Sequence, residues 1–244
     1  MRAIIFAGPT LPPRLRPAVE PNIEWRPPVR QGDVYRAALS GPAVIGVIDG
    51  YFEIVPTVWH KEILWAMAHG VHVLGAASTG ALRAAELDAF GMRGVGQIYQ
   101  AYREGVFEDD DEVAVLHGPE ELGWPAVTEA MVNIRATISE AGRRGVLTPE
   151  LAMHITGIAK ALFYKERTYE RIWRDAAEAG IPAAMLRNIA GWLPSGRIDR
   201  KRADAEMMLD AVRAHLAAEV PQLRVTYSLA ETAAWEAARR YACQ

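Results

Sequence analysis

The stretch VHVLGAASTGALRAAEL, residues 71–87, contains an apolar run, a cluster of small residues and an alanine-rich segment with helical periodicity. This order predicts a strand, a tight turn and a helix. Ser78 stands at the turn, with Gly75 and Ala76 before it and Gly80 two positions after it. Small residues around a serine allow a sharp bend, which presents the hydroxyl at the carboxyl end of the strand, above the start of the helix.

Two interpretations of this serine stay open. The turn has the outline of a nucleophile elbow, although the hydrolase motif has glycine two positions before the serine, where this chain has Ala76. Alternatively, Ser78 or Thr79 only caps the helix, because serine and threonine are both preferred N-cap residues. The first interpretation makes the hydroxyl functional, and the second makes it structural.

A second apolar run, AVIGVI at residues 43–48, predicts a buried strand that ends on Asp49. An amphipathic helix is expected over residues 56–68, so strand, helix and strand follow one another and predict parallel pairing through a right-handed crossover. Asp49 and Ser78 then share one edge of the sheet, the edge at which open α/β sheets bind ligands. The alternative for Asp49 is an Asp-Gly turn without chemistry.

Two more strands are expected outside this centre, at residues 3–7 and 113–116. The second would end on His117, beside a glycine, and would bring a histidine to the same edge. The acidic run at residues 105–112 is typical of a solvated loop, and the pattern beyond residue 119 is helical, with a clear start at Thr148. We therefore predict an α/β fold, with a mainly parallel, Rossmann-like sheet flanked by helices and a helical C-terminal region. The expected domains are residues 1–122 and 123–244.

Composition excludes several classes of function. Half of the 244 residues are hydrophobic, 23% are charged and the net charge is −3, so the sequence has no electrostatic footprint for nucleic acid. Cys243 is the single cysteine, which rules out an intramolecular disulfide and a cysteine metal site and fits a reducing compartment. No apolar run is long enough to span a membrane. We expect a cytoplasmic protein without membrane partner, metal or cofactor.

Several motifs occur in an order that strongly resembles the TfuA family. They are IIFAGPTL, VIDGYF, VWHKEIL, GAASTGALRAAEL, FGMRGVGQIYQAYREG and DDDEVAVLHG. The resemblance is specific over residues 43–118, looser at the N-terminus and weak after residue 122. Thr79 is a departure, because the family more often has methionine there.

The resemblance implies a partner of a YcaO enzyme in thioamidation of ribosomal peptide backbones. The YcaO enzyme is understood to phosphorylate an amide oxygen of the precursor peptide, and a sulfur nucleophile then displaces it. The TfuA-like partner would release or deliver that sulfur from a thiocarboxylated, ubiquitin-like sulfur-carrier protein, which makes it hydrolase-like. The alternative is a non-catalytic adaptor that docks on YcaO and presents the substrate or the carrier.

Release of sulfide from a thiocarboxylate is acyl transfer, which requires a nucleophile, a base and donors to the oxyanion. Ser78 is the candidate nucleophile. The candidate bases are His117 and Lys61, with His60 as a weaker third, and Asp49 adds a carboxylate at the same edge.

The remaining candidate residues belong to the helix that is expected to follow Ser78. The backbone N–H groups near Thr79 and Gly80 are the candidate oxyanion donors. Arg83 and Glu86 lie three positions apart, a spacing that suits an exposed ion pair. In the adaptor hypothesis they are contacts of a binding groove.

Overall fold

A computed structural model describes residues 1–242, so Cys243 lies outside the described residues. The chain divides into two compact units. The first consists of residues 1–108 together with the C-terminal segment from residue 202, and the second consists of residues 109–201. These units differ from the domains predicted from the sequence, which divide at residue 122. The difference arises because the C-terminal segment packs with the first unit rather than with the helices that precede it.

The first unit contains all the strands of the described residues. In chain order, its elements are β1 (Ala3–Phe6), η1 (Pro13–Leu15), β2 (Ile23–Arg26), α1 (Asp33–Leu39), β3 (Val44–Val47), α2 (His60–Ala68), β4 (His72–Ala76), α3 (Thr79–Leu87), η2 (Asp88–Phe90), β5 (Arg93–Val95), α4 (Gln97–Arg103), α9 (Arg200–Ala217) and α10 (Ala233–Ala242). The boundary between the units falls in the first turn of α9.

The strands form one five-stranded sheet in the order β2-β1-β3-β4-β5, and every neighbouring pair is parallel. Val44 of β3 pairs with His72 of β4, which confirms the parallel neighbours predicted around the central stretch. The central strands β1, β3 and β4 are apolar and almost entirely buried, as expected for parallel strands covered on both faces. The predicted α/β fold class is therefore confirmed.

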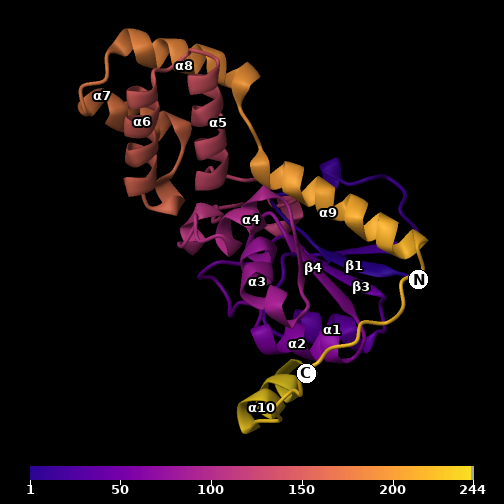
Figure 1. The fold of residues 1–244 in the computed structure, drawn as a ribbon. Helices are drawn as coiled ribbons and strands as arrows, with labels where there is room; N and C mark the ends of the chain where they lie inside the picture. Colours follow the sequence, from indigo (N-terminus) through magenta and orange to yellow (C-terminus); the bar gives the residue numbers. More distant parts are fainter. Residues whose placement is uncertain (243–244) are drawn as a thin grey trace. The chain divides into compact units, whose positions relative to one another are not determined.

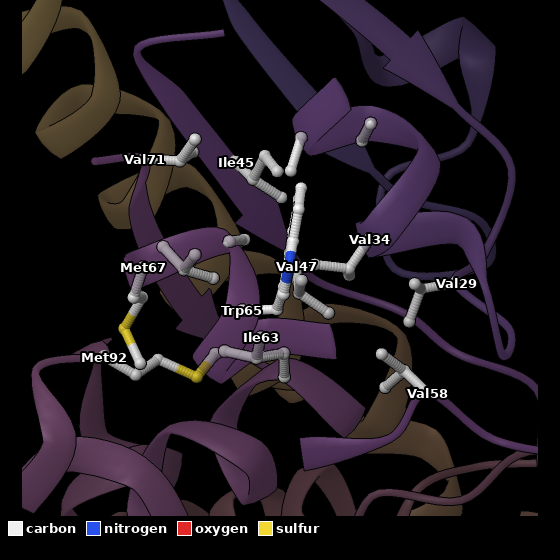
Figure 2. Close-up of a cluster of buried hydrophobic side chains, with 14 of the residues drawn as sticks. Val29, Val34, Ile45, Val47, Val58, Ile63, Trp65, Met67, Val71 and Met92 are labelled. Carbon is white, nitrogen blue, oxygen red and sulfur yellow. The ribbon is translucent and has the colours of Figure 1, made fainter. Parts of the chain in front are cut away.

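Helices cover both faces of this sheet (Figure 1). On one face, Ile45 and Val47 of β3 pack with side chains of α1, α2 and α3, and Figure 2 shows this cluster, including Met67 and Met92. Trp235 of α10 is buried in the same cluster. On the other face, α9 supplies the helical side chains of the cluster, and Met208 is fully buried against the strands.

The predicted strand at residues 113–116 is wrong. This segment is irregular, and Leu116 pairs instead with the turn at residues 127–128, whose N–H groups both donate to its carbonyl. A run of four apolar residues does not distinguish a strand from a buried loop, and here the loop occurs. The sheet instead contains β2 and β5, two edge strands that the sequence analysis missed because neither has a buried apolar run.

The second unit is helical. Its elements are η3 (Asp110–Glu112), η4 (Glu120–Leu122), α5 (Met131–Arg143), α6 (Pro149–Ala161), η5 (Tyr164–Glu166), α7 (Tyr169–Glu178) and α8 (Ala183–Gly196). Its apolar core lies between these helices. Thr148 caps α6 as predicted, since its side chain accepts a hydrogen bond from the N–H of Leu151. No helix within residues 1–242 is both long enough and apolar enough to cross a bilayer.

Candidate functional site

The turn between β4 and α3 is sharp and strained. Ala77 has a φ of +66°, in the left-handed region that residues other than glycine seldom adopt. The N–H of Ser78 donates to the carbonyl of Ala76 at 2.7 Å, which closes a three-residue γ-turn centred on Ala77. Ser78 follows at the N-cap position of α3. The bend is therefore of the elbow type, with the strained residue one position before the serine.

The hydroxyl of Ser78 does not cap α3. Ser78 occupies the N-cap position, but its side chain makes no capping hydrogen bond, whereas the carbonyl of the same residue accepts from Ala81 and Leu82. The residue is only 3% exposed. A buried serine whose hydroxyl is not used for capping fits the functional interpretation of this position better than the capping one.

Glycines allow α3 to lie directly against the sheet. A Cβ atom on Gly80 would lie 1.8 Å from the carbonyl oxygen of Val47, and one on Gly75 would lie 2.1 Å from the carbonyl oxygen of Gly80. The N–H of Gly80 donates to the carbonyl of Ile48 at 3.2 Å. This N–H group is therefore already paired, and the predicted oxyanion donor at Gly80 is a structural link between α3 and the end of β3.

Thr79 faces the loop after β3. Its Oγ1 atom is buried without a hydrogen-bond partner among the described residues. A Cβ atom on Gly50 would lie 2.9 Å from this oxygen, so any larger residue at that position would clash with the threonine side chain. Thr79 and Gly50 therefore meet at the boundary between the carboxyl ends of β3 and β4.

Asp49 lies at the same edge, as predicted, but its carboxylate is bound by the chain itself. Oδ2 accepts from the N–H groups of Gly8 and Thr10 at 2.8 and 3.0 Å, and Oδ1 accepts from the Thr10 hydroxyl at 2.6 Å. Asp49 is 1% exposed. Three donors on a buried carboxylate indicate a residue that fixes the loop after β1 rather than one that exchanges protons with a substrate.

His60, Arg83 and Glu86 come together between α2 and α3. Nε2 of His60 lies 2.8 Å from Oε2 of Glu86, and Nη1 of Arg83 donates to the same oxygen at 2.6 Å. Burial raises the pKa of Glu86, but the hydrogen bonds and charges of His60 and Arg83 outweigh burial, so the pKa lies below its ordinary value. The cluster is an ionised carboxylate that holds an imidazole and a guanidinium.

This cluster lies away from Ser78. Glu86 follows Ser78 by eight positions along α3, which corresponds to ~12 Å at the helical rise of about 1.5 Å per residue. His60 is held at that level, and Lys61 donates to Oγ1 of Thr232 at 3.2 Å. In this arrangement, His60 and Lys61 are engaged by Glu86 and Thr232 rather than by the Ser78 hydroxyl.

His117 is not at the end of a sheet strand, because the strand predicted before it does not form. It belongs to the second unit, where it forms an isolated bridge with Ala126 and its Nδ1 lies 2.8 Å from the Gly118 carbonyl oxygen. The predicted alignment of Asp49, Ser78 and His117 at three strand ends is therefore wrong for its third member.

Metal ligands do not cluster in the described part of the chain, where no group of three or more His, Cys, Asp or Glu side chains could hold an ion. The analysis of the sequence also missed two residues of this edge. One is Thr10, which donates to Asp49. The feature of the sequence that could have indicated it is the Gly-Pro-Thr sequence after the first strand. Ala77 carried no signal, because alanine is not expected at positive φ.

The fold and the edge just described define an α/β protein with a parallel sheet and a serine elbow at its carboxyl edge. Residues 49–168 match the family model described as TfuA-like protein, and the match supports assignment of the chain to the TfuA family. It extends well beyond residue 122, where the resemblance in the sequence had become weak. The comparison with curated proteins finds no match. The family suggests a role in systems related to thioamidation.

Proposed function

We propose that the chain is the partner of a YcaO enzyme in backbone thioamidation of a ribosomal precursor peptide, and that it releases sulfur from a thiocarboxylated, ubiquitin-like carrier protein. The observation that carries the proposal is Ser78, a buried residue at a strained elbow whose hydroxyl is not used as a helix cap. The match to the TfuA-like family over residues 49–168 supports a role in a thioamidation pathway.

The chemistry assigned to Ser78 is acyl transfer. The serine oxygen attacks the carbonyl carbon of the carrier thiocarboxylate, a C–O bond forms, and the C–S bond breaks. The hydroxyl proton leaves with the sulfur as hydrosulfide. Water then hydrolyses the acyl-serine ester, which returns the free hydroxyl and gives the carrier a carboxylate. No electrons are exchanged, so this step needs neither an oxidant nor a cofactor.

The proposal assigns ATP chemistry to the YcaO enzyme. The sequence contains neither GxxxxGK[ST] nor GxGxxG, the loops with which many proteins hold nucleotide phosphates. The sulfide is delivered in the complex with YcaO, which implies a shared compartment, the cytoplasm.

The alternative, a non-catalytic adaptor, is favoured by a different observation. The candidate bases are engaged away from Ser78, with His60 on Glu86 and Lys61 on Thr232, and the N–H of Gly80 is paired with Ile48. In the adaptor function, the cluster of His60, Arg83 and Glu86 contacts the partner, and the elbow is part of a binding groove.

Reconstitution tests the proposed partnership. The chain is mixed with the YcaO enzyme, the thiocarboxylated carrier and the precursor peptide, and size-exclusion chromatography and peptide mass are measured. We expect co-elution with YcaO, and ATP-dependent thioamidation only when both proteins are present. Efficient ATP-dependent thioamidation by the chain alone would refute the assignment of ATP chemistry to its partner.

A further inference from the structure

The strand order of the sheet reverses at one point. From β1 the chain moves outward to β2, and it then returns to the other side of β1 to form β3. Open parallel sheets bind ligands in the crevice at the carboxyl ends of the two strands that flank such a reversal. In this chain the two strands that flank the reversal are β1 and β3, which are followed by residues 7–10 and by residues 48–50.

The loop after β1 directs three hydrogen-bond donors to one place beside the end of β3. They are the N–H groups of Gly8 and Thr10 and the hydroxyl of Thr10. The positive charge of Arg16 is held beside this loop, because its guanidinium donates to the carbonyls of Ala7 and Leu11 at 2.9 Å. Backbone and hydroxyl donors that converge beside a cation form a site for an oxyanion.

The occupant of this oxyanion site is the carboxylate of Asp49. Both of its oxygens are used, and the residue is 1% exposed. Burial lowers the pKa of Arg16, while the negative charge of Asp49 raises it, so the two groups lie within electrostatic reach. The space in which this type of fold takes a ligand anion is therefore filled from within the chain.

We propose that Asp49 is a built-in anion that closes the oxyanion site of the strand reversal, so that the native chain takes no phosphate or carboxylate ligand there. The site accepts a free oxyanion only when the Asp49 side chain is removed. A planar ion with two oxygens, such as formate, matches the geometry of the lost carboxylate.

If Asp49 closes this site, a ligand at the carboxyl edge of the sheet is left with the boundary between the ends of β3 and β4. Gly50 follows Asp49 directly and lies against Thr79. The hydrogen bonds that hold Asp49 therefore also fix the side of the elbow next to β3. Asp49 acts here as a positioning residue. The inference concerns binding and stability, and it stands or fails independently of sulfide release by Ser78.

The test is rescue of Asp49→Ala by formate. Thermal unfolding is measured for the native chain, Asp49→Ala and Asp49→Asn while sodium formate is titrated against sodium chloride of equal ionic strength. We expect a lower Tm for Asp49→Ala than for the native chain, and a saturable rise of this Tm with formate. The native chain and Asp49→Asn, in which a side chain still fills the site, should respond to formate as they do to chloride.

A second experiment removes one of the three hydrogen-bond donors of the site. In Asp49→Ala combined with Thr10→Val, the apparent affinity for formate should fall about tenfold, since one of three hydrogen bonds, worth about 1.4 kcal/mol, is lost. Equal shifts with formate in the native chain and in Asp49→Ala would overturn the proposal.

A third measurement applies if Asp49→Ala does not fold. Binding of inorganic phosphate is then compared between the native chain and Thr10→Val by calorimetry. The proposal expects no binding to either. Binding to the native chain that weakens in Thr10→Val would show an open site and would contradict it.

Discussion

The position of a single hydroxyl depends on the residue before it. Ala77 takes the positive φ that bends the backbone, and this leaves Ser78 at the N-cap position of α3 without a capping bond from its side chain. The sequence predicted the turn from its small residues but left the role of Ser78 open. The conformation of Ala77 could not be predicted, because it is imposed by the packing of α3 on the sheet rather than by an intrinsic preference of alanine.

The absence of a cap predicts a small stability effect at this position. Ser78→Ala should change the free energy of unfolding by less than about 0.5 kcal/mol, because the hydroxyl makes no capping hydrogen bond that the variant could lose. Thr168→Ala is the matched comparison, since Thr168 accepts from the N–H of Arg171 at 3.2 Å and loss of a cap costs about 1 kcal/mol. Urea denaturation of both variants measures the difference, and equal losses would restore the capping interpretation.

A buried glutamate gives the first unit a specific pH dependence. Burial raises the pKa of Glu62 above 4.5, and the N–H groups of Gly32, Trp59 and Tyr35 only partly oppose this. The folded state therefore binds more protons than the unfolded state just above pH 4.5, and the contribution of Glu62 to stability falls as pH rises through the raised pKa. Glu62→Gln should remove this slope, which unfolding curves measured at several pH values would detect. An unchanged slope in the variant would contradict the assignment.

At the scale of elements, the strongest patterns gave correct predictions. Strands β1, β3 and β4 are apolar runs buried on both faces, and their parallel order followed from the helices between them. The edge strands β2 and β5 are partly exposed and carry arginine, so periodicity did not reveal them. The run at residues 113–116 had the composition of a strand but found its hydrogen-bond partners in a neighbouring turn.

The contact of α3 with β3 predicts a large difference between two helical glycines. Gly80→Ala would place a methyl group 1.8 Å from the Val47 carbonyl oxygen and should cost about 3 kcal/mol or more. Gly157→Ala on α6 meets nothing within 4 Å and should stabilise the chain by about 0.5 to 1 kcal/mol. Denaturation of both variants tests the close approach. A mild effect at Gly80 would mean that α3 shifts readily away from the sheet.

At the scale of the whole molecule, each unit has its own core and its own polar framework. Most of the acidic run is exposed, as its composition suggested, but three of its carboxylates are paired with one lysine. Lys160 pairs with Asp109 and Glu112 at 3.0 and 3.1 Å and also with Asp111. Glu112 also pairs with Arg135. The sequence did not reveal these ion pairs, because their basic members come from helices far along the chain.

A fully buried arginine predicts selective loss of the second unit. Arg167 is 0% exposed and donates to the carbonyls of Ala159 and Leu162 and to Asp111. Arg167→Met leaves these acceptors unpaired and should cost about 3 to 5 kcal/mol. Limited proteolysis should then cut preferentially within residues 109–201. Arg174→Met, at a side chain that is 63% exposed, is the control and should behave as the native chain does. Cleavage spread equally over both units would contradict the expectation.

Sulfide release from a thiocarboxylated carrier by the native chain and by Ser78→Ala tests the central claim most directly. If Ser78 is the acyl acceptor, the rate should fall by roughly a thousandfold or more, while the exposed control Ser195→Ala stays near the native rate. His117→Ala, Lys61→Ala and His60→Ala in the same assay identify the base, because its loss should approach that of Ser78→Ala. A Ser78→Ala variant with near-native release, or a native chain that stimulates YcaO without releasing sulfide, would contradict the catalytic account and establish the adaptor.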